Sequence, residues 1–220
     1  MLDKLRMNDY KGAIFDIDGT LLDSMPIWEN VAADYLRTRG VTPHSALNDE
    51  LAALGGHEIP SYFRDVYGLH ETAETIQRGV YELLEEFYFF KAPLKKGVVA
   101  VLDTLREHSV KMSVATATDR RLVEPALKRL GIFDYFVRLF TCSEEETSKS
   151  SPDIFIRAAA FMETGIADTL VVEDALYAMK SAKRAGFPVA AVYDRSAHDK
   201  QDEIKEISDY YFISLDEMLG

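Results

Sequence analysis

The sequence predicts an α/β fold, a doubly wound parallel sheet into which an all-helical segment is inserted. Short apolar runs rich in β-branched and aromatic residues alternate along most of the 220-residue chain with segments whose apolar residues recur at helical spacing. Because the expected strands are almost continuously apolar, helices should cover both faces of the sheet. Residues 23–91 carry helical patterns only. We therefore expect a core domain of residues 1–22 and 92–220 and a helical domain of residues 23–91.

Six apolar segments are expected to form the strands of this sheet. In chain order they are Tyr10–Ile17, Lys111–Thr116, Phe136–Thr141, Leu170–Val172, Val189–Val192 and Tyr210–Ile213. The helical segment follows the first of them directly. We therefore expect it at the carboxyl ends of the strands, which is the edge where open α/β sheets bind ligands.

Capping and breaking residues indicate where the helices between these strands begin and end. Gly131 and Gly186 stand where two helices should end, because glycine readily adopts the left-handed conformation of a helix terminus. The run Ser151-Pro152-Asp153 should begin another helix, with the serine as N-cap and the proline at the first helical position. Pro125 lies inside a helical pattern at Asp119–Leu130, so it should kink this helix or delay its start.

Residues 23–91 read as a succession of helices. Ser24 is a suitable N-cap for a helix that runs through Arg37 and stops at Gly40. A second helix is expected to begin at Thr42-Pro43 and to end near Gly55-Gly56. A long helix, the last of residues 23–91, is marked by apolar residues at helical spacing: Ile76, Val80, Leu83, Leu84 and Phe87.

Composition excludes several classes of function. The chain has 25 Lys and Arg against 37 Asp and Glu, a net charge of −12, and no basic stripe that would bind nucleic acid. No apolar run reaches the roughly eighteen residues that a membrane-spanning helix needs. The single Cys142 cannot form an internal disulfide, and Met1–Tyr10 lacks the apolar core of a signal peptide, so we expect a cytoplasmic location. We expect a monomer, with a homodimer as the alternative.

The segment Phe15–Ser24 is the most informative part of the sequence. Asp16 and Asp18 are two residues apart at the end of an apolar strand, so both carboxyl groups can point into the crevice beyond it. Gly19 permits a tight turn and a close approach of the backbone. The whole string resembles the first motif of the haloacid-dehalogenase-like hydrolase superfamily.

Three later features follow the order of that superfamily's motifs. Thr116 ends the second expected strand, where the family keeps a phosphate-binding serine or threonine. Lys149 comes shortly before Pro152-Asp153, as in the family's lysine motif, although the usual proline after the lysine is Ser150 here. Glu173-Asp174 follows an apolar strand and resembles the acidic fourth motif. The resemblance spans nearly the whole chain and implies a Rossmann-like core with residues 23–91 as its helical cap.

The resemblance implies a Mg²⁺ site in the crevice. Its ligands would be the carboxylates of Asp16 and Asp174 and the backbone carbonyl of Asp18, completed by waters and a phosphate oxygen. Glu173 would act on this site indirectly, through a water molecule. These are hard oxygen donors of the kind that Mg²⁺ prefers.

The resemblance also implies roles in phosphoryl transfer. Asp16 would attack phosphorus and form an aspartyl-phosphate, while Asp18 would protonate the leaving oxygen and later take a proton from water. Thr116, the backbone N–H of Ala117 and Lys149 would bind the phosphoryl oxygens where negative charge spreads in the transition state. Lys149 would also keep Asp16 ionised.

The expected function is therefore that of a Mg²⁺-dependent phosphatase of the capped type. Its substrate would be a small phosphomonoester, either a sugar phosphate or a phosphorylated small acid. The alternative is a β-phosphoglucomutase-like phosphomutase, which uses the same core residues and differs in how the cap excludes water. A metal-free dehalogenase is disfavoured by Asp18, and a non-catalytic phosphate-accepting domain is disfavoured by the helical insert.

Other chemically versatile residues are weaker candidates. His57 lies on a loop of the insert that is able to face substrate, and Trp28 is a candidate for lining the pocket, whereas Tyr35 is expected to pack. Cys142 has no paired histidine and is expected to be inert. The five histidines show no metal-ligand spacing: His44, His57, His70, His108 and His198.

Overall fold

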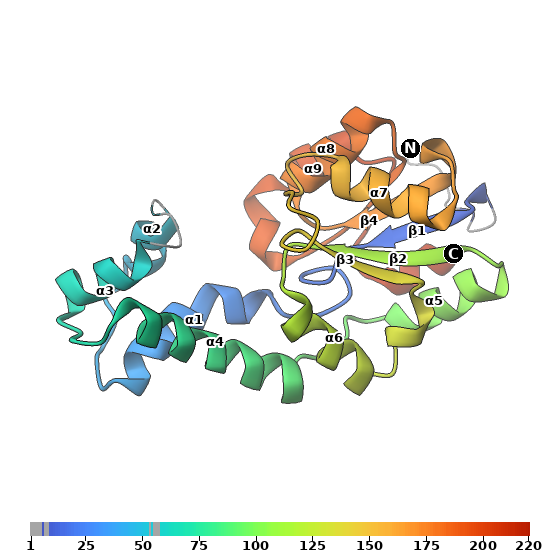
Figure 1. Ribbon diagram of the computed structural model, residues 1–220. Helices are drawn as coiled ribbons and strands as arrows, with labels where there is room; N and C mark the ends of the chain where they lie inside the picture. Colours follow the sequence, from blue (N-terminus) through green and yellow to red (C-terminus); the bar gives the residue numbers. More distant parts are fainter. Residues whose placement is uncertain (1–5, 7–8, 53, 55–57) are drawn as a thin grey trace. The chain divides into compact units, whose positions relative to one another are not determined.

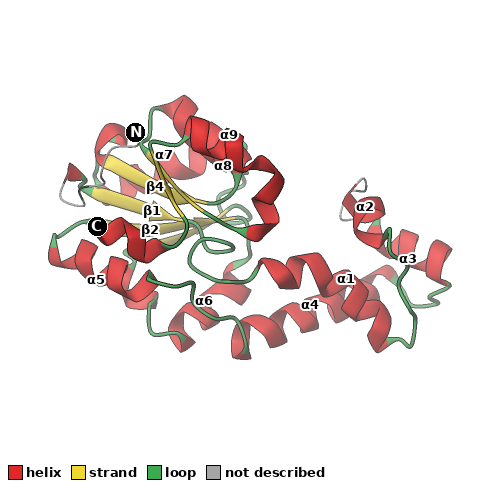
Figure 2. Ribbon diagram, turned by 180° about the vertical axis from the view of Figure 1, so that it is seen from behind, coloured by secondary structure: helices red, strands yellow, loops and turns green. Residues whose placement is uncertain are grey.

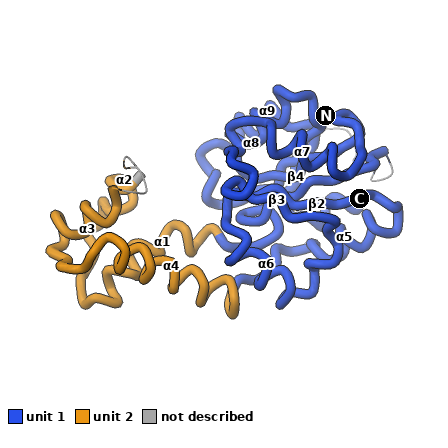
Figure 3. Tube along the Cα trace, viewed as in Figure 1, with its two compact units in different colours: residues 1–24, 92–220 blue, residues 25–91 orange. Residues whose placement is uncertain are grey.

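A computed structural model of the chain describes residue 6 and residues 9–52, 54 and 58–220. The chain divides into two compact units, unit 1 formed by residues 1–24 and 92–220 and unit 2 formed by residues 25–91 (Figure 3). The helix end expected near Gly55-Gly56 and the candidate substrate contact His57 lie outside the described residues. Among the helices that are described, none is both long and apolar enough to cross a bilayer.

The described residues of unit 1 form a six-stranded sheet in which every neighbouring pair of strands is parallel. Its order is β3-β2-β1-β4-β5-β6. The strands are β1 (Gly12–Phe15), β2 (Lys111–Thr116), β3 (Arg138–Thr141), β4 (Thr169–Glu173), β5 (Val189–Val192) and β6 (Tyr210–Phe212). The six expected strands and the parallel sheet are confirmed, although β1 is shorter than the predicted Tyr10–Ile17 and β3 begins at Arg138 instead of Phe136.

Helices cover this sheet on both sides, as the apolar strands require. The helices of unit 1 are α5 (Val98–Glu107), α6 (Arg120–Arg129), α7 (Asp153–Met162), α8 (Leu176–Ala185) and α9 (Gln201–Ile207). In both ribbon views α7, α8 and α9 lie on one side of the sheet, and α5 and α6 lie on the other (Figures 1 and 2). Short 3₁₀ turns complete the connections at Phe133–Tyr135, Ile166–Asp168, Arg195–Lys200 and Leu215–Leu219.

The order of the strands creates a crevice at one point of the sheet. Successive strands run outward from β1, first to β2 and β3 and then to β4, β5 and β6 on its other side. The chain segments that leave β1 and β4 therefore diverge to opposite faces of the sheet. In doubly wound sheets this switch point, at the carboxyl ends of the strands, is where ligands bind.

In unit 1 both expected glycine stops are confirmed, the expected serine cap is wrong, and the delayed start considered for the helix with Pro125 is not observed. Gly186, with φ +92°, and Gly131, with φ +72°, end α8 and α6 as predicted. The helix expected to begin at Ser151 begins at Asp153 with Pro152 as its N-cap, and the Ser151 hydroxyl instead donates to the Asp153 carboxylate at 2.8 Å. Pro125 does not delay α6.

The α6 helix begins at Arg120 and continues past Pro125 to Arg129. A proline inside a helix removes one backbone hydrogen bond. Its cost is offset here because α6 buries a complete apolar face against the sheet, formed by Leu122, Val123, Ala126 and Leu127.

Unit 2 consists in its described residues of α1 (Met25–Thr38), α2 (Leu47–Ala52), α3 (Ile59–Tyr67) and α4 (Ala73–Phe90). Its core includes Tyr35, which is fully buried and stacks on Phe63 with ring centroids 6.0 Å apart. The helix predicted from Thr42-Pro43 begins only at Leu47. Instead of joining a helix, the backbone N–H of His44 donates to the Tyr67 hydroxyl at 3.3 Å.

Candidate active site

The loop after β1 carries the two aspartates of the first motif to the switch point. The backbone N–H of Asp16 still donates to Val172 of the neighbouring strand β4, at 3.0 Å, so Asp16 is held at the edge of the sheet. Gly19 follows with a φ of +85°, which favours glycine. A Cβ at this position would also overlap the carboxylate of Asp174. The turn therefore requires glycine for two independent reasons.

Lys149 reaches this crevice from the loop that precedes α7. Its side chain is only 2% exposed and donates to both the Asp16 carboxylate and the Glu173 carboxylate. A buried ammonium is tolerated because both partners are anionic and hydrogen-bonded to it. Burial works against the charge, but Asp16 and Glu173 outweigh it and raise the pKa of Lys149.

The end of β4 and the start of α8 supply the acidic pair. Glu173 is fully buried, and its second carboxylate oxygen accepts the backbone N–H groups of Asp174 and Ala175, each at 3.0 Å. Asp174 is also buried and accepts a hydrogen bond from the Thr20 hydroxyl at 2.9 Å. Both oxygens of Glu173 are thus occupied by protein donors, whereas Asp174 keeps an oxygen beside Gly19.

Three carboxylates converge in this crevice. Asp16, Glu173 and Asp174 each offer an oxygen within 4.8 Å of the others, and all three side chains are buried. Burial, the largest influence, raises the pKa of Asp16 to about 7 despite the opposing effect of Lys149. Burial and the neighbouring Glu173 raise the pKa of Asp174 as well. A single ammonium therefore does not balance this cluster, and a divalent cation held by oxygen ligands would.

Asp18 lies next to this cluster with its carboxylate held from two sides. The Ser24 hydroxyl donates to one of its oxygens at 2.5 Å, and the Thr118 hydroxyl donates to the other at 2.6 Å. Asp18 is only partly buried, unlike Asp16. Its carboxylate is therefore oriented by hydroxyl groups while remaining accessible to a solvent-borne ligand.

Two of the three residues expected to bind phosphate, Thr116 and Ala117, lie at the end of β2 and in the loop just beyond it. Thr116 ends the strand and is buried, and its hydroxyl oxygen accepts the backbone N–H of Thr118 at 3.1 Å. Ala117 between them is exposed. Since Thr118 also binds Asp18, this loop and the loop after β1 are joined directly.

Comparison with known proteins agrees with this arrangement. A family model described as haloacid dehalogenase-like hydrolase matches residues 13–192. The chain belongs to this family. It is therefore an enzyme of the hydrolase class, as the sequence motifs indicated.

Named relatives cover most of the chain. A Bacillus subtilis protein assigned as a phosphatase, YhcW, is 27% identical over 186 residues, which cover 83% of each chain. A phosphoglycolate phosphatase of Rhodobacter capsulatus is 29% identical over 183 residues, 80% of each chain. The solved structure of a Thermotoga maritima protein assigned as a β-phosphoglucomutase has a TM-score of 0.80, covers 95% of this chain and 96% of its own, and is 20% identical. At that identity the likeness establishes the fold alone.

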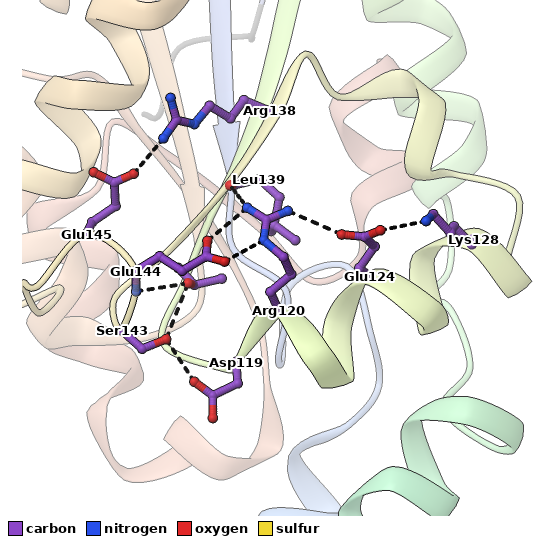
Figure 4. Close-up of polar contacts among 10 residues, drawn as sticks. Asp119, Arg120, Glu124, Lys128, Arg138, Leu139, Ser143, Glu144 and Glu145 are labelled. Atoms are coloured by element: carbon purple, nitrogen blue, oxygen red, sulfur yellow. Dashed lines mark hydrogen bonds and ion pairs between the residues drawn. The ribbon is translucent and has the colours of Figure 1, made fainter.

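In this haloacid dehalogenase-like hydrolase, exposed ion pairs anchor the loop that carries Lys149 (Figure 4). Arg120, the first residue of α6, donates to both carboxylate oxygens of Glu144, at 2.6 and 2.9 Å, and to the carbonyl of Leu139 at 2.7 Å. Ser143 donates to Asp119 at 2.8 Å. The loops that carry Thr116 and Lys149 are thus connected at the surface, and in the crevice each of them contacts the loop after β1.

Three further residues of this hydrolase contact the expected site residues and were given no role in the site from the sequence. They are Thr20, Ser24 and Thr118. A fourth, Lys95, donates to the carbonyl of Gly19, next to Asp18. Ser24 was interpreted only as a helix cap, and Thr118 was given no role. Lys95 carried no signal at all, since it is one of 25 basic residues and lies outside every motif.

Proposed function

We propose that this protein is a Mg²⁺-dependent phosphatase that hydrolyses a small phosphomonoester through an aspartyl-phosphate. The observation that carries the proposal is the convergence of Asp16, Glu173 and Asp174 in one buried cluster, in which the amine of Lys149 binds Asp16 and Glu173. The names of the relatives support it, because both similar sequences cited above are called phosphatases. A sugar phosphate or a phosphorylated small acid is the proposed substrate class.

The residues fit Mg²⁺ by their chemistry. Asp16 and Asp174 offer carboxylate oxygens, and the backbone carbonyl of Asp18 would add a third oxygen. Glu173 would act through water, because Lys149 and two backbone N–H groups already occupy its oxygens. A bound Mg²⁺ supplies the positive charge that favours ionised Asp16 and offsets the charge of the phosphate ester.

In the proposed reaction an oxygen of Asp16 attacks phosphorus, and the bond from phosphorus to the ester oxygen breaks. Asp18 gives its proton to the departing alkoxide. It then takes a proton from the water that attacks the aspartyl-phosphate, so that phosphate is released and both aspartates return to their starting states. The hydrogen bonds from Ser24 and Thr118 would orient Asp18 for both transfers.

The phosphoryl oxygens would be bound by Thr116, the backbone N–H of Ala117 and Lys149. Negative charge spreads over these oxygens in the transition state, so donors aimed at them lower the barrier. Lys149 would change partners little, because it already donates to the carboxylate of Asp16. We propose that unit 2 serves as the cap that excludes water from this site.

A phosphate-release assay over many metabolite monoesters tests the proposal directly. We expect release that depends on Mg²⁺, stops on addition of EDTA and returns when Mg²⁺ is restored. Turnover that resists the chelator would contradict the metal requirement. The same reactions should be searched for an isomerised sugar phosphate, since isomerisation without phosphate release would identify a phosphomutase instead.

We also propose that the enzyme acts as a monomer in the cytoplasm. The single cysteine, Cys142, suits a reducing compartment. Burial raises the pKa of its thiol, so it is expected to stay protonated and unreactive at neutral pH. Light scattering coupled to gel filtration would give the mass of the particle, and the mass of a dimer would overturn the proposal of a monomer.

A further inference from the structure

Lys95 is a second largely buried lysine that the proposed reaction does not use. It lies on the segment where the chain returns to unit 1, and its backbone N–H donates to Leu21 at 2.9 Å. Its side-chain amine donates to the Gly19 carbonyl at 2.6 Å, the Tyr193 carbonyl at 2.8 Å and the Asp194 carboxylate at 2.8 Å. An ammonium group has three donors, and all three are used.

The partners of Lys95 make this arrangement rigid. The side chains of Lys95 and Asp194 are 15% and 7% exposed, so the ion pair is largely shielded from water. Asp194 is fixed in turn, since its other carboxylate oxygen accepts two hydrogen bonds from Ser196, one from the backbone N–H at 2.9 Å and one from the hydroxyl at 2.7 Å. Two of the three contacts of Lys95 thus lie at the end of β5. The third reaches across to the turn after β1.

The contact with Gly19 falls at a sensitive point of that turn. Gly19 has a positive φ and the large conformational freedom of glycine. The peptide after it is held from both ends, because the Thr20 N–H donates to the Ile17 carbonyl at 3.3 Å and the Gly19 carbonyl accepts from Lys95 at the shorter distance of 2.6 Å. The peptide that Lys95 holds joins Gly19 to Thr20, whose hydroxyl binds Asp174. On the other side of Gly19 stands Asp18, whose carbonyl is the proposed third oxygen ligand.

We propose that Lys95 is a positioning residue that holds the Asp18–Thr20 turn in the conformation needed to bind the divalent cation. This proposal rests on the proposed function. Without the amine, the Gly19–Thr20 peptide keeps the 3.3 Å hydrogen bond from Thr20 to Ile17 but loses its shorter contact, so it can tilt, which shifts the Asp18 carbonyl and moves the Thr20 hydroxyl relative to Asp174. Residues that orient metal ligands from outside the coordination shell typically change metal affinity by about 10- to 100-fold when they are removed.

The test compares two variants that share one substitution. Asp194→Asn is the reference, and Lys95→Met/Asp194→Asn differs from it only by the loss of the amine, so neither leaves a buried carboxylate without its cation. Mg²⁺ binding is measured by calorimetric titration of the metal-free proteins, independently of turnover. We expect binding about 10-fold weaker in the double variant than in the reference. At saturating Mg²⁺ we expect the KM for substrate to be unchanged and kcat to recover in part.

Lys96→Met is the control for removing a lysine from this segment. The Lys96 side chain is 77% exposed and pairs with Asp216, away from the turn. We expect it to bind Mg²⁺ like the unmodified protein. Lys95→Gln/Asp194→Asn provides a second comparison if the methionine variant does not fold, because the amide of glutamine retains a donor, and here we expect an intermediate affinity.

Equal Mg²⁺ affinity of the reference and both Lys95 variants would overturn the positioning role while leaving the phosphatase intact. Absence of both Mg²⁺ binding and phosphate release in the unmodified protein would overturn the proposed function and this inference together. Thermal unfolding of the metal-free variants shows whether a loss of affinity is accompanied by general loss of structure. A native-like transition with weakened binding supports the positioning role.

Discussion

The loop between β3 and α7 contributes to two charged clusters, one through Lys149 and one through Glu144, and the two clusters behave in opposite ways. The Lys149 cluster, formed by Lys149, Asp16, Glu173 and Asp174, is buried in the crevice. The Arg120 cluster is exposed at the surface and consists of Arg120, Glu124, Lys128 and Glu144 (Figure 4). Both contain carboxylates in direct contact with basic groups, so their different behaviour comes from their surroundings.

The pKa values of the carboxylates move in opposite directions. In the Arg120 cluster, hydrogen bonds from Lys128 and Arg120 are the largest influences and lower the pKa of Glu124 and of Glu144. In the Lys149 cluster, burial is the largest influence and raises the pKa of Asp16 to about 7. Contact with a cation therefore does not by itself keep a carboxylate ionised. Desolvation and the excess of carboxylates over cations prevail in the crevice, and this imbalance is what a divalent cation would correct.

The largest expected effect comes from Asp16→Asn. Loss of the attacking carboxylate should lower phosphate release by roughly 10⁴-fold or more, as removal of a nucleophile does in other enzymes. The fold should remain, because the substitution removes one of three crowded carboxylates. Initial rates and the thermal transition check this, with Glu124→Gln from the Arg120 cluster as the control that keeps its activity. Near-normal turnover of the asparagine variant would refute the assigned nucleophile.

Lys149→Met should be costly for both stability and activity. It leaves Asp16 and Glu173 facing each other in a buried site without a cation, a change that typically costs about 3–5 kcal/mol of unfolding free energy. Loss of a donor to the phosphoryl oxygens should lower kcat by roughly 10²- to 10³-fold. Urea unfolding of the metal-free protein at neutral pH measures the first effect. A loss below about 1 kcal/mol would mean that the burial of the Lys149 cluster has little energetic effect.

Arg120→Met is the matched substitution in the exposed cluster and should have a far smaller effect. Arg120 and Glu144 are 37% and 45% exposed, so water screens their interaction. We expect a change of about 1 kcal/mol or less in the free energy of unfolding. The kcat should stay within about twofold, because Lys149 is held mainly by its contacts in the crevice. A tenfold drop in kcat would show that the surface contacts position Lys149 after all.

The pair of Lys95 and Asp194 sharpens the comparison because it is largely buried but contains one positive and one negative charge. Burial alone would raise the pKa of Asp194, yet hydrogen bonds from Lys95 and Ser196 outweigh it and lower the pKa below 3.8. The carboxylate therefore contributes stability that is fully present above its unfolded pKa and is lost as the pH falls through its lower folded pKa.

We accordingly expect Asp194→Asn to make the unfolding free energy fall less steeply with decreasing pH below about pH 4. Urea unfolding between neutral and acidic pH measures this slope, and Asp202→Asn, an exposed aspartate at the start of α9, serves as control. An unchanged slope in the Asp194 variant would contradict the lowered pKa. Among the four predictions, this is the smallest expected effect.

The expected site residues differ in how far sequence reasoning placed them. Asp16, Asp18, Lys149 and Asp174 were named because a strand-end motif and the order of three later motifs resemble a known family. Thr20, which binds Asp174, and Lys95, which binds Gly19, were not named, since a threonine or a lysine has no distinctive chemistry until its neighbours are known. Lys95 binds residues that are 76, 98 and 99 positions away in the chain. No local pattern encodes contacts over such separations.

The sequence by itself determined the alternation of strands and helices, the parallel sheet and the helical insert. These follow from hydrophobic periodicity, which each segment carries within its own residues. Tertiary structure decided that α6 tolerates Pro125, that His44 bonds to Tyr67 instead of starting a helix, and which carboxylates lose their water. Those outcomes depend on burial and on distant partners, and the resulting desolvation energies exceed the local preferences from which the sequence was interpreted.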